Sequence, residues 1–364
     1  MQLINTDNTI RFVTFLQHSG IAIIFVFMPI LAKKVTESIF EIGIIVSMFS
    51  LAQILSELYF GRASDKKEKR LAFIRFGFLG CAITFGLHYF ADNTMLLLII
   101  RICAGITSGM MIPAMLAYIY ESGKNKKKVA SVVSFHALGW LVGIIIGGVT
   151  NNEKSIFIVS SLLFLIGFII SIKLSEITVI EKTDRSTKEI FLKNKFLFLS
   201  LLLRHIGAAS VWTILPIMLV EVLHAKFYEI SIVYVSNTLT AFIMMNLMAY
   251  KINLKNTTKF KIGIGVTVFV FIGLSTINEW WMAIPYMSLV GATWAFIFIG
   301  GNFHLMRNNP KSTSTGIFST TLSIASVIGP IFAGILTFYF NYILVMYFAI
   351  IIISIAYVVS LKTK

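Results

Sequence analysis

Residues 61–70 read GRASDKKEKR and separate two apolar stretches, at residues 40–60 and 71–90. Each apolar stretch has about 20 residues, the length at which a helix crosses the hydrocarbon core of a bilayer. The segment between them combines a glycine, an aspartate and five Lys or Arg residues. A short basic connection of this kind is typical of the turn between two transmembrane helices.

The same alternation of apolar stretches and short polar turns runs along the whole chain. Of its 364 residues, 57% are hydrophobic and 13% are charged, with a mean hydropathy of +0.87; soluble domains have roughly 25% charged residues. We therefore predict an all-α integral membrane protein with twelve transmembrane helices. The predicted spans are residues 11–32, 40–60, 71–90, 95–120, 129–149, 155–173, 196–222, 228–250, 261–277, 280–306, 313–339 and 342–361.

The basic residues are distributed unevenly between the two sides of this predicted topology. The formal net charge is +15; 24 Lys or Arg residues fall on one side, four on the other, and Arg75, Arg101 and Arg204 lie within spans. Because positive residues favour the cytoplasmic side, both termini are predicted to be cytoplasmic. The positive charge thus reflects a multi-pass protein of the cell membrane and gives no reason to expect nucleic acid as a partner.

An internal repeat relates the two halves at an offset of 186 to 188 residues. His18-Ser19-Gly20 matches His205-Ile206-Gly207, Phe40-Glu41-Ile42 matches Tyr228-Glu229-Ile230, and the glycines at 143 and 148 match those at 329 and 334. Six spans per unit give both halves the same orientation, as in a parallel repeat. We predict an N-terminal six-helix bundle at 1–172, a cytoplasmic linker at 173–195 and a C-terminal six-helix bundle at 196–364.

Residues 61–70 resemble the signature loop of the major facilitator superfamily, in which a glycine precedes an acidic residue by four positions, followed by a basic residue and a basic pair. Gly61, Asp65, Lys66, Lys69 and Arg70 match this pattern, whereas Glu68 stands where a second glycine is usual. Span count, orientation and repeat agree with the same family. The resemblance implies two bundles around a central cavity and transport of a small molecule by alternating access.

The matched segment is also predicted to act as a gate. We expect Gly61 to allow close backbone approach and Asp65 to lie near the start of the span at 313–339, where a helix N-terminus favours an anion. Glu121, at the inner end of the fourth span, lies within reach of Lys69 or Arg70, in a pair that water and salt would screen. The alternative is that the segment serves only as a basic topology signal.

The fourth span carries Arg101, Gly105 and Gly109, which resemble a second motif of the superfamily: an arginine followed by a glycine four positions later. An unpaired guanidinium inside the membrane is costly. Arg101 is therefore a candidate for binding substrate or for influencing a proton carrier. The alternative is that its side chain extends to the outer headgroups.

The fifth span has glycines at strict four-residue spacing, a pattern that lets helices pack closely. These are Gly139, Gly143 and Gly147, with Gly148 beside the last. They also resemble a glycine-rich motif of some antiporters in the superfamily, although Ile144 occupies the position of its proline. Gly329 and Pro330 are the corresponding pair in the second half, and the proline suggests a bend.

The spans contain no Asp or Glu near their centres. Candidates for proton coupling are therefore the histidines His18, His136 and His205, and Glu57 near a helix end; each histidine has the alternative of a purely structural hydrogen bond. Polar and aromatic residues within spans are candidates for lining the cavity. They are Arg101, His136, Trp140, Arg204, His205, Trp212, Tyr234, Asn237, Trp294 and Asn302.

The predicted function is that of a secondary transporter, resembling the multidrug-efflux-like branch and using proton-coupled efflux. Two alternatives are an uncoupled uniporter and a membrane sensor that does not transport. Phosphate-binding glycine loops, metal-spaced Cys and His clusters, and carboxylate pairs for acid–base catalysis are missing from the sequence, which argues against an enzyme, a cofactor or a metal. The predicted partners are a small neutral or anionic solute, protons and the lipid bilayer, and the predicted active form is a monomer.

Overall fold

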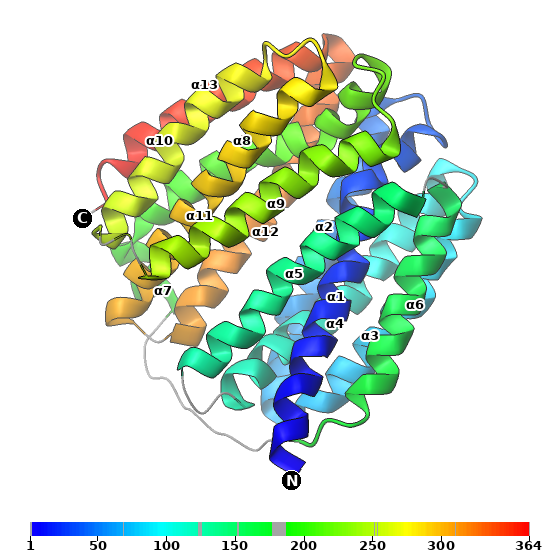
Figure 1. Cartoon of the computed structure of the whole chain (residues 1–364), viewed down its shortest axis with the longest axis vertical. Helices are drawn as coiled ribbons and strands as arrows, with labels where there is room; N and C mark the ends of the chain where they lie inside the picture. The colour runs from blue at the N-terminus through cyan, green and yellow to red at the C-terminus, as the bar shows by residue number, and fades with distance from the viewer. Residues whose placement is uncertain are drawn as a thin grey trace. The chain divides into compact units, whose positions relative to one another are not determined.

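A computed structural model describes residues 2–67, 69–122, 126–150, 153–176, 187–250, 252, 254–309 and 311–363, in which all regular secondary structure is helical (Figure 1). The first half of the chain forms α1 (Gln2–Lys33), α2 (Ile39–Lys67), α3 (Arg70–Leu87), the 3₁₀ turn η1 (His88–Phe90), α4 (Thr94–Ser122), α5 (Lys126–Thr150) and α6 (Glu153–Ser171). The second half forms α7 (Thr187–Lys193), α8 (Lys195–Glu221), α9 (Phe227–Tyr250), α10 (Asn256–Leu274), the 3₁₀ turn η2 (Trp280–Met282), α11 (Ala283–Asn308), α12 (Lys311–Tyr339) and α13 (Tyr342–Ser360).

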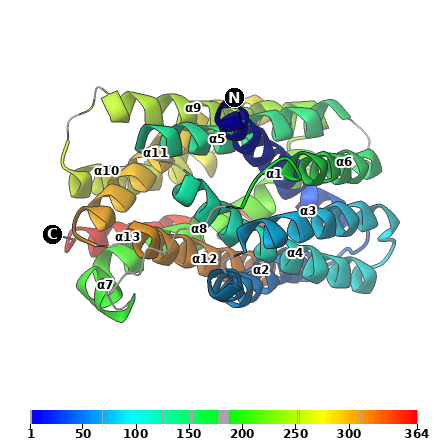
Figure 2. The ribbon, with the colours of Figure 1, turned by 90° about the horizontal axis from the view of Figure 1, so that it is seen from below.

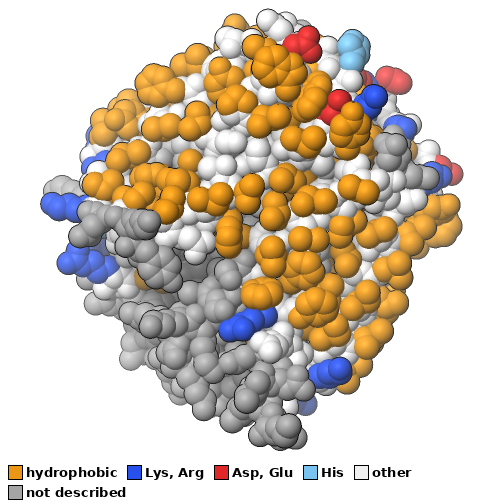
Figure 3. Space-filling view, viewed as in Figure 1, with side chains coloured by type: hydrophobic (Ala, Val, Ile, Leu, Met, Phe, Trp, Pro, Cys, Tyr) orange, Lys and Arg blue, Asp and Glu red, His pale blue; other side chains and the backbone are white. Residues whose placement is uncertain are grey.

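The surfaces of these helices are those of a membrane protein. Within the described residues, eleven helices are long and apolar enough to cross a membrane, and the apolar part of α5, Phe135–Thr150, is shorter. Large hydrophobic side chains remain on the outside, such as Phe76, which is 67% exposed, and Phe269, which is 72% exposed. In Figure 3, hydrophobic side chains cover much of the described face, and most charged ones lie toward its margins. Exposed apolar surface of this extent is expected against lipid.

Most helix ends lie close to the predicted span boundaries, but α1 and α2 are longer. α1 begins at Gln2, and α2 continues to Lys67 through most of the segment that was predicted to be a loop. Hydropathy marks the part of a helix that lies in lipid, whereas Ala, Lys and Arg have good helix propensity and extend α2 beyond it. The prediction of a loop at 61–67 is therefore wrong.

Helix contacts divide the chain into two compact units. The first comprises Met1–Glu37 and Met48–Glu181. In it, α1 packs against α5 and α6, and α3 packs against α4 and α6; Figure 2 shows α3, α4 and α6 as neighbours. Backbone hydrogen bonds within each helix leave its apolar side chains free to face either the unit's interior or lipid.

The second unit comprises Ser38–Ser47 and Lys182–Lys364. Here α8 packs against α12 and α13, α10 against α11 and α13, and α9 against α11. The first turns of α2 belong to this unit: the Ser47 hydroxyl donates a hydrogen bond to the Val327 carbonyl at 2.9 Å. Gly43 contacts the Pro330 carbonyl so closely that a side chain there would clash.

The repeat found in the sequence has a counterpart in the packing of each unit. A Cβ atom built on Gly143 of α5 would lie 2.5 Å from the Ser19 carbonyl of α1, and one built on Gly329 of α12 would lie 2.8 Å from the Ile206 carbonyl of α8. Real Cβ contacts are essentially never this short. Repeat-related glycines therefore make the same kind of helix contact in the two units.

Candidate functional site

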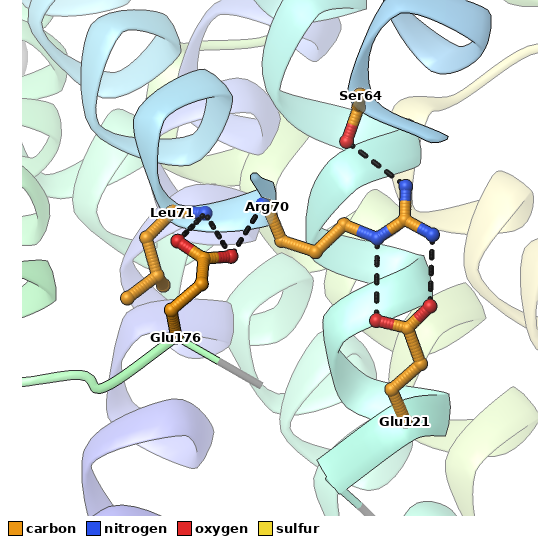
Figure 4. A network of polar contacts seen from close by, with 5 residues as sticks. All are labelled: Ser64, Arg70, Leu71, Glu121 and Glu176. Atoms are coloured by element: carbon orange, nitrogen blue, oxygen red, sulfur yellow. Dashed lines mark hydrogen bonds and ion pairs between the residues drawn. The ribbon is translucent and has the colours of Figure 1, made fainter. Parts of the chain in front are cut away.

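An ion pair joins the start of α3 to the end of α4 (Figure 4). Arg70 donates from Nε to Glu121 Oε2 at 3.2 Å and from Nη2 to Glu121 Oε1 at 2.8 Å. Its Nη1 donates to the Ser64 hydroxyl at 3.0 Å, which adds α2 to the contact. The two charged side chains are only 12% and 16% exposed, so this bidentate pair is more buried than the screened pair expected from sequence.

A residue that sequence reasoning missed caps the same end of α3. The carboxylate of Glu176 accepts hydrogen bonds from the backbone N–H groups of Arg70 and Leu71 (Figure 4). These N–H groups lack partners inside the helix, and a carboxylate also suits the positive end of the helix dipole. Glu176 belongs to the segment predicted as a linker, and no local capping pattern points to it because it lies over 100 positions from α3.

Two further side chains of the same unit, Arg75 and Tyr118, form hydrogen bonds with the backbone just before Glu176. Arg75 donates to the carbonyls of Ser171, Ile172 and Leu174, at 2.9 Å for Leu174. The Tyr118 hydroxyl donates to the Ser175 carbonyl at 2.9 Å. The chain leaving α6 is therefore fixed to α3 and α4 before it reaches the linker.

Removing the cap should loosen α3 at its start. We expect Glu176→Ala to cost about 0.5 to 2 kcal/mol of local stability, as other N-cap losses do. Hydrogen–deuterium exchange read by mass spectrometry should show faster exchange at residues 70–75 and unchanged exchange at 99–110. Glu189→Ala, at an exposed site in α7, is the matched control. Unchanged exchange at 70–75 in the Glu176 variant would contradict the capping role.

The remaining residues of the signature segment are placed differently from expectation. Gly61 lies inside α2, and a Cβ atom there would meet Pro113 at 3.6 Å, an ordinary van der Waals distance. The expected close backbone approach at Gly61 is therefore wrong. Lys69 is exposed, and the side chains of Asp65 and Lys66 lie outside the described residues.

The glycines of the second motif bring α4 against α2. Side chains at Gly105 and Gly109 would clash with the carbonyls of Phe49 and Gln53, respectively. Nearby, the Gln53 amide donates to the Glu57 carboxylate at 2.7 Å. Both glycines thus lie where small residues permit close helix packing.

Arg101 of α4 is buried, with 5% of its surface exposed. Its guanidinium carbon lies 4.2 Å from the centre of the Phe49 ring, in a cation–π contact. Its Nε has no hydrogen-bond partner among the described residues. The side chain is thus buried within the unit against Phe49, which favours a role inside the bundle over the snorkelling alternative.

Two of the candidate histidines are in direct contact. The imidazole rings of His18 in α1 and His136 in α5 stack with their centres 3.4 Å apart and their planes 9° from parallel. One turn further along α5, Trp140 makes an edge contact with Phe25, with ring centres 5.3 Å apart. The structure therefore brings together two residues that the sequence offered only as separate candidates.

The glycines of α5 allow this helix to approach α1 closely. A Cβ atom on Gly139 would lie 2.6 Å from the Phe15 carbonyl and 2.9 Å from His18 Cβ. Gly147 faces the Phe27 ring at clashing distance for any side chain, and Gly148 is buried. The close contact of α1 and α5 that Gly139 permits also sets the distance between the two imidazoles.

In the second unit, Arg204 and His205 of α8 both face Trp294 of α11. The Arg204 guanidinium carbon lies 5.7 Å from the centre of the Trp294 ring system, and the His205 ring centre lies 5.8 Å from it. Arg204 is 1% exposed, and its Nε and Nη2 have no partner among the described residues. Nδ1 of His205 is likewise unpaired there.

The other aromatic and amide candidates continue from this cluster. Trp212 lies beside Tyr234, with ring centres 6.4 Å apart, and the buried Tyr234 hydroxyl has no partner among the described residues. Asn302 donates from Nδ2 to the Phe298 carbonyl at 3.1 Å, and its Oδ1 is unpaired within the same residues. The Asn237 carbonyl lies directly against Gly291, so that this candidate serves helix packing at least through its backbone.

Gly329 and Pro330 lie within one continuous helix, α12. The Ser210 hydroxyl donates to the Gly329 carbonyl at 2.9 Å, and Gly329 packs against α8. Across the described residues, no group of three or more His, Cys, Asp or Glu side chains is arranged to hold a metal ion.

Comparisons with known proteins agree with this architecture. The family described as Major Facilitator Superfamily matches residues 10–315. Multidrug resistance protein MdtG of Proteus mirabilis (strain HI4320) is 23% identical, over 92% of this chain and 89% of that protein. Quinolone resistance protein NorA of Staphylococcus aureus (strain COL) is also 23% identical, over 88% of this chain and 87% of that protein.

Solved structures give the same result for the fold. The crystal structure of the nucleoside transporter NupG aligns with a TM-score of 0.78 and 13% identity, over 99% of this chain and 100% of that one. A bacterial homolog of the human lysosomal transporter Spinster, inward-facing and occupied, aligns with a TM-score of 0.77 and 14% identity, over 100% and 96%.

The fold and the helix surfaces define a polytopic helical protein of the cell membrane. The chain belongs to the major facilitator superfamily, as the resemblance of its signature segment predicted. It is therefore a membrane transport protein and not an enzyme.

Proposed function

We propose that this transporter is a secondary active exporter of a small organic solute, working by alternating access as a monomer. The observation that carries the proposal is membership of the superfamily over residues 10–315. The direction and the solute class rest on MdtG and NorA, whose names specify multidrug and quinolone resistance. The absence of any central carboxylate from the spans favours a solute that is not cationic.

The proposed topology has twelve spans and two cytoplasmic termini. The basic residues support it through their 24-to-4 distribution between the sides. α5 is 25 residues long as a whole, which is sufficient for a span although its apolar part is shorter. The proposed domains are two six-helix bundles, 1–172 and 196–364, joined by the linker 173–195.

We assign the contact of Arg70 with Glu121 to the cytoplasmic gate of this cycle. It fixes α3 to α4 at the end where the signature segment lies, and Ser64 connects the pair to α2. A fixed geometry at this end would let the bundle move as one body when the gate opens. Contact of Asp65 with the N-terminus of α12 stays a prediction.

Proton coupling is assigned to the stacked pair of His18 and His136. Histidine changes charge near neutral pH, and two cationic rings with centres 3.4 Å apart would repel each other. We therefore expect the pair to carry one proton at a time. His18→Gln or His136→Gln should abolish the dependence of solute transport on a pH gradient while leaving solute binding unchanged, as measured in proteoliposomes.

An exposed histidine provides the control for that experiment. His224 lies after α8 with a positive φ of 51°, a conformation that asparagine tolerates. His224→Asn should keep the full dependence on the pH gradient. If transport by the His18 and His136 variants depended on the pH gradient as strongly as transport by the parent, proton coupling would lie elsewhere. His205 would then be the next candidate.

Transport itself is tested with the purified full-length protein in proteoliposomes. Fluorescent dyes, quinolones and organic acids should be screened with and without an imposed pH gradient, against liposomes carrying no protein. Accumulation driven by the gradient supports the proposal. Transport that follows only the solute gradient would favour the uniporter, and no transport of any compound would favour the sensor.

A further inference from the structure

Arg204 is a buried cation to which the described residues offer no anion. It lies about 14 Å from the start of α8, given a rise of about 1.5 Å per residue, and is 1% exposed. Its buried guanidinium nitrogens Nε and Nη2 have no hydrogen-bond partner there, and no carboxylate of that part of the chain lies within ion-pair distance of it. A buried arginine normally needs such a partner, because leaving a charge unpaired is expensive.

The protein compensates only in part. Trp294 offers the face of its ring at 5.7 Å, an attraction that is weaker than an ion pair and leaves N–H groups unsatisfied. On the same face of α11, Phe298 lies 5.6 Å from Trp294 between ring centres, and Asn302 follows one turn later with an unpaired Oδ1. Cation, aromatic rings and amide thus follow one another along one side of the unit.

This combination matches one chemical class of ligand. A carboxylate has two oxygens spaced to accept from two guanidinium nitrogens, and an aromatic body attached to it would stack on the indole. We propose that Arg204 and Trp294 form the binding site for an aromatic organic anion, the substrate class of the proposed transport cycle. The inference rests on the proposed function for its biological meaning, although the site itself is tested by binding alone.

Among the described residues, Arg101 is also a buried arginine, but it is better satisfied by a neighbouring ring than Arg204. Its guanidinium carbon lies closer to a ring, 4.2 Å from the centre of Phe49, compared with 5.7 Å between Arg204 and Trp294. Cation–π stabilisation grows as the cation approaches the ring. Arg101 is therefore the better satisfied of the two by the protein itself.

The experiment measures equilibrium binding to the full-length protein in detergent by isothermal titration calorimetry. The probes are 2-naphthoate, the neutral 2-naphthamide, and the cationic 2-naphthylmethylamine, which share one ring system. The parent should bind the carboxylate at least about tenfold more tightly than the amide or the amine, since a tenfold ratio corresponds to only one additional strong contact. Arg204→Gln should lose that preference and keep the affinity for the amide, and Arg204→Lys should keep part of it.

Two further variants complete the design. Arg307→Gln removes the same charge from the exposed end of α11 and should keep the preference for the carboxylate. Trp294→Leu should weaken carboxylate and amide alike, and it tests the site if the Arg204 variants do not elute as a single species in size-exclusion chromatography.

The inference is overturned if Arg204→Gln or Trp294→Leu binds 2-naphthoate like the parent. It is equally overturned if the parent prefers the amide or the amine, or binds no member of the series. None of these results depends on transport. Binding with the expected pattern but without transport in proteoliposomes would instead reject the proposed function.

Discussion

Gly143→Leu should leave almost no folded protein, because α1 and α5 cannot pack around the added side chain. A Cβ atom alone would lie 2.5 Å from the Ser19 carbonyl, 2.9 Å from Ala22 Cβ and 3.0 Å from Ser19 Cα. Two of these atoms are backbone and the third is fixed to it, so no rotamer change relieves the clash. Overpacking of this kind costs about 1 to 3 kcal/mol for small additions, and leucine adds three further carbons.

The measurement is fluorescence-detected size-exclusion chromatography in detergent with a thermal ramp. Gly143→Ala should elute as the parent does but unfold at a lower temperature, and Gly143→Leu should elute largely as aggregate. Gly316 of α12 is the matched control, because nothing lies within 4 Å of a Cβ built there. Gly316→Ala should unfold at the parent temperature or above, since alanine favours a helix over glycine by about 1 kcal/mol. Parent-like behaviour of Gly143→Leu would refute the packing argument.

Glu121→Gln should destabilise the protein and stop transport. The substitution leaves the guanidinium of Arg70, which is 12% exposed in its side chain, without its counter-charge. Removing one member of a buried ion pair costs about 3 to 5 kcal/mol; access to water at this helix end should bring the loss toward about 2 to 3 kcal/mol. The effect on transport follows because α3 and α4 would no longer be fixed together at the proposed gate.

A double-mutant cycle separates the pair from its surroundings. Arg70→Gln combined with Glu121→Gln should be less destabilised than the sum of the single variants, by about 1 to 3 kcal/mol. Glu37→Gln is the control: its pair with Lys33, at 3.6 Å, involves a carboxylate that is 97% exposed and should contribute little. Additive losses would show that Arg70 and Glu121 do not depend on each other.

The helical fold was predictable because lipid imposes a pattern that hydropathy detects directly. The glycine spacing in α4 and α5 was also informative, since close contact of two helices requires a small residue every fourth position. The extension of α2 to Lys67 was not predictable in this way, because polar residues in a helix beyond the membrane leave no hydropathy signal. Residues 61–67 are few and polar, a pattern that fits a turn as well as it fits a continued helix.

The candidate sites were predictable in their members but not in their pairings. The sequence offers His18 and His136 separately, and only the packing of α1 on α5 stacks them. Glu176 was not predicted as a cap of α3, because a cap from a distant segment follows no spacing rule in the sequence. For Arg204 the informative fact is the lack of an acidic neighbour among the described residues, which depends on the three-dimensional arrangement of α8 and α11.

The contact between Arg204 and Trp294 also bears on how the chain is made. The two residues are 90 positions apart. The ribosome therefore delivers α8, with Arg204, to the membrane well before Trp294 has been synthesised. A charged arginine at the centre of a span opposes insertion by about 2.5 to 3.5 kcal/mol. We therefore expect α8 to stay at the translocon until α11 has been synthesised. Nascent chains that end before residue 294 should insert α8 into the membrane less efficiently than chains that include this residue.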